Sequence, residues 1–168
     1  IGICLAKAIQ KLHQMQPPLL YLDCKPSNVM KDSDGKIRLI DFGSALEAHT
    51  PVTKGISASP GYAAPEQLSR ETEKRCVDVR TDVFGLGRTL YALLCGADLS
   101  RPPYAFASLK SRCPQVGDEL EQIIMRATAR EPEARFQTME AFLQVLLALQ
   151  EACTVDDLSL IHISEPTR

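Results

Sequence analysis

Two short polar segments of this chain carry the side chains that phosphoryl transfer needs. The first is YLDCKPSN, residues 21–28, and the second is DFG, residues 41–43. Together they supply an aspartate, a lysine, an asparagine and a second aspartate. Phosphoryl transfer requires a carboxylate that receives the hydroxyl proton, a cation for the transferring phosphate, and oxygen ligands for magnesium. The two segments therefore indicate a phosphotransfer site.

A short hairpin between the two segments is expected to bring them together. Apolar and charged residues alternate after Asp34-Gly35, a pair that tolerates the positive backbone angles of a tight turn. Asn28 stands at the start of this hairpin and Asp41 at its end. The pattern therefore predicts that these two side chains converge on one metal ion.

A calcium site is the competing interpretation of the hairpin. Asp32, Asp34, Gly35 and Asp41 partly match a calcium-binding helix–loop–helix loop. However, Met30 occupies the position of that loop's first carboxylate, and the flanking residues are typical of strands rather than helices. We therefore exclude calcium binding.

The remaining hydrophobic pattern is mainly helical. Helices are expected at 1–12, ended by Pro17-Pro18, at the apolar stretch 83–94, closed by Gly96, and near 119–130 and 139–150. A short apolar strand is expected at 19–22. The helix at 83–94 is expected to be buried at the centre.

Composition narrows the functional classes. With 168 residues, 45% of them hydrophobic and 24% charged, the chain can bury a core as one globular unit. A net charge of −2 is not typical of a nucleic-acid binder, and six cysteines without close pairing do not form a zinc motif. No apolar run reaches the roughly 20 residues of a membrane span. We expect a cytoplasmic protein, or the cytoplasmic domain of a membrane protein, with no nucleic-acid partner.

Five motifs in order make residues 1–150 resemble the C-terminal lobe of a serine/threonine protein kinase, most like the bacterial kinases of the Hanks type. YLDCKPSN resembles the catalytic loop, DFG the metal-binding loop, and AAPE the end of the activation segment. DVFGLG resembles the start of the central helix, and EPEARF the segment before the last helix. The resemblance implies a protein kinase-like α+β fold, a predominantly α-helical lobe with a small β-hairpin. It also implies ATP and Mg²⁺ as cofactors.

The resemblance assigns the chemistry to four side chains. Asp23 would orient the substrate hydroxyl and accept its proton, and Lys25 would bind the transferred phosphate. Asn28 and Asp41 would coordinate magnesium with the nucleotide phosphates, because a hard cation prefers oxygen ligands. A lysine at position 25 is typical of serine/threonine rather than tyrosine specificity. The implied partner is a protein substrate with a Ser or Thr acceptor.

Other residues take supporting roles in the same resemblance. Met30 would form the floor under adenine, and Ser59 would shape the acceptor site next to the catalytic residues. Phe42 would pack inward, with Tyr21 beside it at a position where such kinases usually carry histidine. These residues would complete the nucleotide and substrate sites.

Three further residues are expected to hold the site in place. Glu66 and Arg135 would form a buried ion pair that ties the activation segment to the helical base. Asp82 would cap its own helix and accept backbone N–H groups of the catalytic loop. The resemblance thus predicts a support beneath the loops as well as the loops themselves.

Two residues of the catalytic loop depart from the usual pattern. Leu22 stands where many kinases have an arginine that receives a phosphate on the activation loop, and leucine cannot neutralise a dianion. We therefore expect weak dependence on loop phosphorylation, although Thr50, Thr53 and Ser57 are available acceptors. Cys24 follows the catalytic aspartate, and we expect an inert buried residue rather than a reactive thiol.

The chain is expected to be a fragment. One helix precedes the catalytic loop, so the N-terminal lobe, with its glycine-rich loop and strand lysine, is expected to be absent. Residues 151–157 are expected to be a tail, and residues 158–168, LSLIHISEPTR, resemble a translated sequencing adapter and are expected to be non-native. Because nucleotide positioning supplies most of the catalysis, the fragment itself is expected to be inactive.

The predicted function of the parent protein is ATP-dependent phosphorylation of protein Ser/Thr hydroxyls. A pseudokinase or scaffold without catalysis is the alternative, and the upstream sequence would decide between them. Small-molecule phosphotransferases of related fold use a similar Asp and Asn spacing. Lys25, the AAPE segment and Arg135 argue against that class, because they serve a peptide-binding groove.

Overall fold

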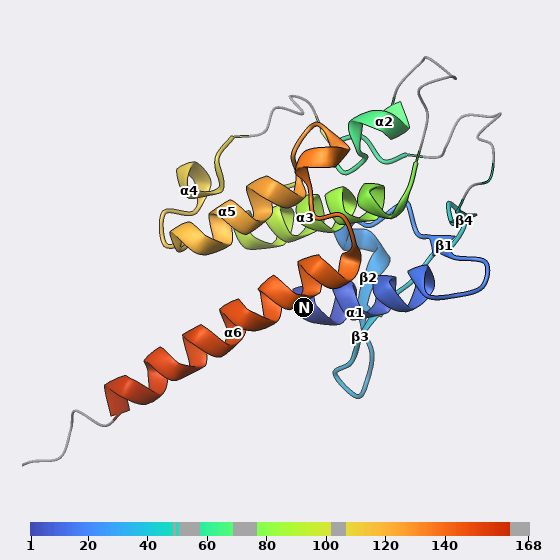
Figure 1. Cartoon of the computed structure of the whole chain (residues 1–168). Helices are drawn as coiled ribbons and strands as arrows, with labels where there is room; N and C mark the ends of the chain where they lie inside the picture. Colours follow the sequence, from blue (N-terminus) through green and yellow to red (C-terminus); the bar gives the residue numbers. More distant parts are fainter. Residues whose placement is uncertain (49, 51–57, 69–76, 102–106, 162–168) are drawn as a thin grey trace, which may run out of the picture.

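The computed structural model describes residues 1–48, 50, 58–68, 77–101 and 107–161, with side chains to residue 152. Helices form the body of the molecule, and a β-hairpin projects from it (Figure 1). The elements in chain order are α1 (Gly2–His13), β1 (Leu19–Leu20), η1 (Pro26–Asn28), β2 (Val29–Lys31), β3 (Ile37–Leu39), β4 (Leu46–Glu47), α2 (Pro65–Leu68), α3 (Val79–Cys95), α4 (Leu109–Arg112), α5 (Asp118–Ala127), η3 (Pro132–Ala134) and α6 (Met139–Ile161).

Helix α3 is the buried centre of the structure, as its apolar sequence predicts. It packs against α1, α5 and α6, and four of its buried side chains belong to the main hydrophobic core: Val83, Leu86, Leu90 and Tyr91. The helix ends at Gly96, whose φ of 59° is the left-handed conformation that glycine adopts without steric cost. The core therefore places α3 directly beneath the two polar segments.

The start of α3 corrects one expectation, because Asp82 does not cap this helix. Asp78 is the N-cap: its carboxylate accepts the N–H of Arg80, and its own N–H donates to the hydroxyl of Thr81. This reciprocal arrangement is a capping box. Asp82 lies in the first turn, and its carboxylate bonds outside the helix.

The expected hairpin is confirmed as β2 and β3. These strands pair antiparallel, with Val29 opposite Leu39, and Gly35 turns the chain with a φ of 79°. At the open end of the hairpin the N–H of Ile40 donates to the carbonyl oxygen of Asn28 at 3.0 Å. The residue before Asp41 is therefore tied to Asn28, so the hairpin brings the two polar segments to one end.

A second small sheet was not predicted from the sequence. Strand β1 is shorter than the expected strand at 19–22, and it pairs antiparallel with β4. Leu20 lies opposite Leu46 in this pair. A two-residue strand carries no alternation that a sequence pattern can reveal. The pair ties the segment after DFG to the chain just before the catalytic loop.

Helix α6 is longer than predicted. The pattern indicated a helix near 139–150, but α6 is continuous to Ile161 and projects beyond the body of the molecule (Figure 1). No glycine or proline lies between Met139 and Ile161, so no strong helix breaker interrupts it. The boundaries expected at 150 and 157 are therefore not ends of secondary structure.

Across the described residues, no helix combines the length and apolarity that a bilayer span requires.

Candidate active site

Asp23, Lys25 and Ser59 form a closed hydrogen-bonded triangle. The ammonium of Lys25 donates to Oδ2 of Asp23 at 2.7 Å and to Oγ of Ser59 at 2.7 Å. The hydroxyl of Ser59 donates to Oδ1 of Asp23, also at 2.7 Å. Asp23 is 8% exposed, so both carboxylate oxygens are held in fixed directions within a mostly buried setting. The structure thus joins three residues that the sequence singled out in two separate segments.

Asn28 holds the backbone of Asp23 from the other side. The 3₁₀ turn η1 begins with Pro26 and returns the chain so that the Asn28 amide faces the aspartate. Its Nδ2 donates to the carbonyl oxygen of Asp23 at 2.9 Å and to Oδ2 at 3.2 Å. Asn28 is therefore oriented by the same residue that it supports.

Asp41 presents an exposed carboxylate at the end of the hairpin. Its φ of 64° is uncommon for a residue other than glycine. Oδ1 accepts the N–H of Gly43 at 3.0 Å. Among the described residues, no hydrogen bond or ion pair involves Oδ2, so one oxygen faces outward for a ligand.

Phe42 does not pack inward as expected. Its side chain is 47% exposed, and its ring meets that of Tyr21 edge to face, with 5.3 Å between centroids. Tyr21 fills the interior instead: it is buried, and its hydroxyl donates to the carbonyl oxygen of Ile40 at 2.5 Å. Burial raises the pKa of Tyr21, which keeps the phenol neutral. The contact between the two rings is as expected, but Phe42 is half exposed and does not pack inward.

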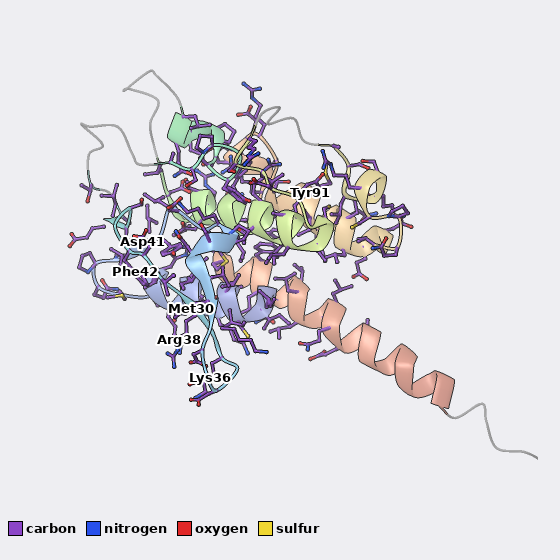
Figure 2. The ribbon with its side chains drawn as sticks, turned by 180° about the vertical axis from the view of Figure 1, so that it is seen from behind. Met30, Lys36, Arg38, Asp41, Phe42 and Tyr91 are labelled. Carbon is purple, nitrogen blue, oxygen red and sulfur yellow. The ribbon has the colours of Figure 1, made fainter. Side chains whose placement is uncertain are left out.

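Met30 lies on the outer surface of the hairpin. It is 47% exposed on β2. Figure 2 shows Asp41 and Phe42 together, with Met30 farther along the hairpin toward Lys36 near its tip. Met30 is thus open to a ligand, as its expected place under adenine requires, and that role stays a prediction.

Asp82 fixes the catalytic loop from below, as predicted. Its Oδ2 accepts the N–H of Tyr21 at 2.8 Å, and its Oδ1 accepts the N–H of Leu22 at 2.7 Å. The ring of His13, at the end of α1, lies 2.7 Å from Oδ2 through Nε2. Sequence reasoning missed His13, because a single histidine at the end of an amphipathic helix carries no distinctive signal. Asp82 is 1% exposed, so this support is fully buried.

Two neighbouring residues of α3 hold the two halves of the site. The hydroxyl of Thr89 contacts the carbonyl oxygen of Cys24 at 2.8 Å. Nε of Arg88 donates to the carbonyl oxygen of Gly61 at 2.6 Å. Gly61 has a φ of 86°, and a Cβ there would lie 1.8 Å from the carbonyl oxygen of Leu99, so only glycine fits. No role for Arg88 or Thr89 was predicted from the sequence, although an arginine inside an apolar helix is a signal that could have been used.

Glu66 and Arg135 form the expected ion pair. Two parallel bonds of 2.7 and 2.9 Å join the guanidinium to the carboxylate, and Arg135 is 1% exposed. The guanidinium also donates to the carbonyl oxygen of Ala129 at 2.8 Å and lies over the ring of Phe84 at 4.9 Å. Every face of Arg135 is therefore occupied, and the pair ties α2 to the segment before α6.

Leu22 packs in an apolar cluster. It is 5% exposed and contacts a small core with Leu20 and Val77. Its φ of 64° is strained for a leucine, so burial of the side chain must offset that strain. The side chain that replaces the usual arginine therefore serves packing and offers no charge to a phosphate.

We expect loop phosphorylation to have little effect on activity. Thr50 is exposed, whereas Thr53 and Ser57 lie outside the described residues. Replacing all three by alanine in the complete protein should change kcat/KM by less than about threefold, because no arginine at position 22 is present to bind a loop phosphate. Steady-state kinetics of the triple variant would measure this. Abolished activity would contradict the expectation.

Cys24 is buried, and its thiol is expected to be inert. It is 2% exposed, and burial raises its pKa to about 12. Burial both shields the thiol of Cys24 and disfavours its thiolate, so exposed Cys4 should react with iodoacetamide and Cys24 should not. Peptide mass mapping of folded and urea-unfolded protein would test this. Equal labelling of both cysteines in the folded protein would contradict it.

The side chains of the site fit a magnesium ion that takes some of its ligands from the protein and the others from nucleotide phosphates and water. Among the residues described, no three His, Cys, Asp or Glu side chains gather as a protein-only metal site. Asn28 and Asp41 lie at one end of the hairpin, and the outward oxygen of Asp41 is the hard ligand that Mg²⁺ prefers. Magnesium usually takes one or two protein ligands together with phosphates and waters. The donor set is therefore suited to that ion in the presence of a nucleotide.

Residues 1–155 match the family model of the protein kinase domain. The chain therefore belongs to the protein kinase domain family, and the expected kinase-like fold is confirmed. Rhodopsin kinase GRK1 of Rattus norvegicus is 35% identical over 142 residues, covering 83% of this chain and 22% of that protein. Serine/threonine-protein kinase PknB of Mycolicibacterium smegmatis is 28% identical, covering 97% of this chain and 28% of that protein.

Another bacterial relative is also similar. Serine/threonine-protein kinase Pkn1 of Myxococcus xanthus is 35% identical over 155 residues, covering 77% of this chain and 21% of that protein. The chain thus spans between 21% and 28% of the length of these three relatives. Kinases named for serine/threonine specificity are therefore among its relatives.

Proposed function

We propose that this chain is the C-terminal lobe of a bacterial Hanks-type kinase, and that the complete protein transfers the γ-phosphate of ATP to Ser or Thr hydroxyls of proteins. The observation that carries this proposal is the triangle of Asp23, Lys25 and Ser59. It holds a carboxylate and an ammonium side by side, beside a cavity that is open to solvent. Phosphoryl transfer needs this pairing, because catalysis depends on positioning and on charge stabilisation.

Asp23 is the proposed proton acceptor. It orients the acceptor hydroxyl and takes its proton as the bond to phosphorus forms. The hydroxyl of Ser59 already donates to Oδ1 of Asp23 at 2.7 Å, which supports this role. Lys25 is the proposed partner of the transferred phosphate, because its ammonium reaches the same carboxylate from the other side.

Asn28 and Asp41 are the proposed magnesium ligands. The ion would neutralise charge on the β- and γ-phosphates of the nucleotide. Asp23 orients the Asn28 amide, and the turn at Gly43 orients the Asp41 carboxylate, so neither side chain depends on the ion for its direction. Met30 is the proposed contact for adenine.

Serine/threonine specificity is supported by the contact between Lys25 and Ser59. The ammonium of Lys25 lies 2.7 Å from Oδ2 of Asp23 and 2.7 Å from Oγ of Ser59, so it takes up space beside the acceptor aspartate. A small hydroxyl side chain reaches Asp23 past this lysine more readily than a tyrosine ring does. We also propose a cytoplasmic location, which the four unpaired cysteines of the described residues support.

We propose that residues 1–168 alone do not catalyse the reaction. No G-x-G-x-x-G pattern occurs within them. In protein kinases that loop covers the phosphates, and a strand lysine pairs with them. The nucleotide contacts would then come from residues outside this segment.

A transfer assay with labelled ATP and a generic basic protein tests the proposal. The complete protein should phosphorylate the substrate, and the polypeptide 1–168 should not. Transfer by neither protein, with ATP binding absent from the complete protein, would support the pseudokinase alternative. Transfer by the isolated 168 residues would contradict the requirement for further nucleotide contacts.

A further inference from the structure

Arg88 is a charged residue in the middle of the mostly apolar helix α3, and it is only 3% exposed. Burying a guanidinium costs free energy unless its N–H groups are bonded, so arginine seldom occupies such a position without partners. One of its partners is the carbonyl oxygen of Gly61, which accepts the N–H of Nε at 2.6 Å. A buried charge thus holds the backbone of the segment that precedes α2.

Gly61 belongs to a short turn that also carries Ser59. The carbonyl oxygen of Ser59 accepts the N–H of Tyr62 at 3.1 Å and the N–H of Ala63 at 3.0 Å. Residues 59–63 are therefore joined by their own backbone bonds, and they move as one unit. A contact that fixes Gly61 also fixes the position of Ser59.

The side chain of Ser59 connects this turn to the catalytic residues. Its oxygen lies 2.7 Å from Oδ1 of Asp23 and 2.7 Å from Nζ of Lys25. Asp23 and Lys25 are also joined directly, at 2.7 Å, so their mutual contact does not depend on Ser59. A shift of the turn would therefore change the surroundings of the acceptor hydroxyl while the proton-accepting carboxylate keeps its partner.

The catalytic loop is held by other side chains of the same helix. The hydroxyl of Thr89 contacts the carbonyl oxygen of Cys24 at 2.8 Å, and Asp82 accepts two backbone N–H groups of the same loop. Consecutive residues of an α-helix point about 100° apart, so Arg88 and Thr89 reach different segments from one rigid element. The two halves of the site thus depend on different side chains of α3.

We propose that Arg88 is a positioning residue for the protein substrate. Through its bond to Gly61 it holds the turn 59–63 where the acceptor Ser or Thr is received beside Asp23. This inference rests on the proposed function, because it concerns the substrate side of the same site. The proposed magnesium ligands lie on the hairpin, outside this turn, so Arg88 should affect the peptide substrate and not ATP.

Arg88→Met and Arg88→Gln form a matched pair for kinetics with the complete protein. Both remove the charge, but glutamine carries an N–H donor as many bonds from the backbone as Nε, whereas methionine carries none. Arg88→Met should raise KM for a serine peptide about tenfold, and Arg88→Gln should stay within about threefold. In both variants kcat and KM for ATP should stay within about threefold. Equal peptide KM values in the two variants, or a parallel rise in KM for ATP, would overturn the proposal.

Thr89→Val provides the comparison from the next position of α3. It removes the contact to Cys24, which stands between Asp23 and Lys25 in the sequence. This variant should lower kcat about tenfold and leave KM for the peptide within about threefold. If Thr89→Val instead raised the peptide KM as Arg88→Met does, α3 would hold the site as one unit and the separate role of Arg88 would be wrong.

Hydrogen exchange followed by mass spectrometry separates this inference from the proposed function, because it needs neither ATP nor peptide. The N–H groups of Tyr62 and Ala63 should exchange about tenfold faster in Arg88→Met than in Arg88→Gln, with residues 21–28 unchanged. If the unchanged protein transfers no phosphate, the proposed function fails, and the exchange rates still decide whether Arg88 holds the turn. Equal exchange in the two variants contradicts the inference even where phosphate is transferred.

Discussion

Replacing Glu66 by alanine is expected to lower the free energy of unfolding of this chain by about 3–5 kcal/mol, because it leaves a buried guanidinium without its counter-charge. Arg135 is 1% exposed and makes two bonds to Glu66, of 2.7 and 2.9 Å. The bonds from Arg135 to backbone carbonyl groups would remain, but none of them carries a full negative charge. Urea unfolding followed by circular dichroism measures the difference.

Glu133→Ala is the matched control for this prediction. Its carboxylate is 75% exposed and lies 3.3 Å from Arg80, so the same substitution there should change the free energy of unfolding by less than about 1 kcal/mol. A double variant in which leucine replaces Arg135 and methionine replaces Glu66 should recover part of the loss, since no buried charge is then unpaired. If Glu66→Ala cost no more than the control, the pair would not tie α2 to the helical base.

Replacing Asp23 by asparagine is expected to lower kcat of the complete protein by about 10²–10⁴-fold. Asparagine has the same shape, but it cannot take the hydroxyl proton and it loses the charge-assisted bond to Lys25, 2.7 Å long in the structure. KM for ATP should change little, because Asp23 is not a proposed ligand of the nucleotide. Steady-state kinetics with saturating peptide measure both quantities.

Asp34→Asn controls for the general loss of one carboxylate. Asp34 lies in the turn of the hairpin with a side chain that is 70% exposed, and its ion pair with Lys36 is long at 3.9 Å. Its replacement should leave kcat within about twofold of the unchanged protein. If Asp23→Asn retained more than a tenth of the activity, another group would have to accept the proton.

The sequence predicted most of the site because its residues fall in contiguous motifs. The hairpin follows from alternation around an Asp-Gly turn, and the buried α3 follows from one long apolar stretch closed by glycine. The triangle depends on a contact between Ser59 and Asp23, which are 36 residues apart in the sequence. No local sequence pattern predicts such a contact. It could be expected only because the motifs occur in the order found in kinases.

The features that escaped prediction depend on tertiary packing. His13 contacts Asp82, which is 69 residues away in the sequence, and Arg88 contacts Gly61, which is 27 residues away. Neither contact can be predicted from a local sequence pattern. Phe42 was expected to pack inward, but Tyr21 is the buried ring of the pair and Phe42 is half exposed. The N-cap of α3 was misplaced because two aspartates stand near the helix start, and only the backbone of Asp78 is extended as a cap requires.

Identification of the phosphorylated residue is the most direct test of the central claim, that these loops form a serine/threonine phosphotransfer site. The complete protein is incubated with labelled ATP, Mg²⁺ and a peptide mixture that holds serine, threonine and tyrosine acceptors in equal amounts, and the products are separated as phosphoamino acids. Label is expected on serine and threonine, and it should be lost in Asp23→Asn but not in Asp34→Asn. Label on tyrosine alone, or label that persists in Asp23→Asn, would contradict it.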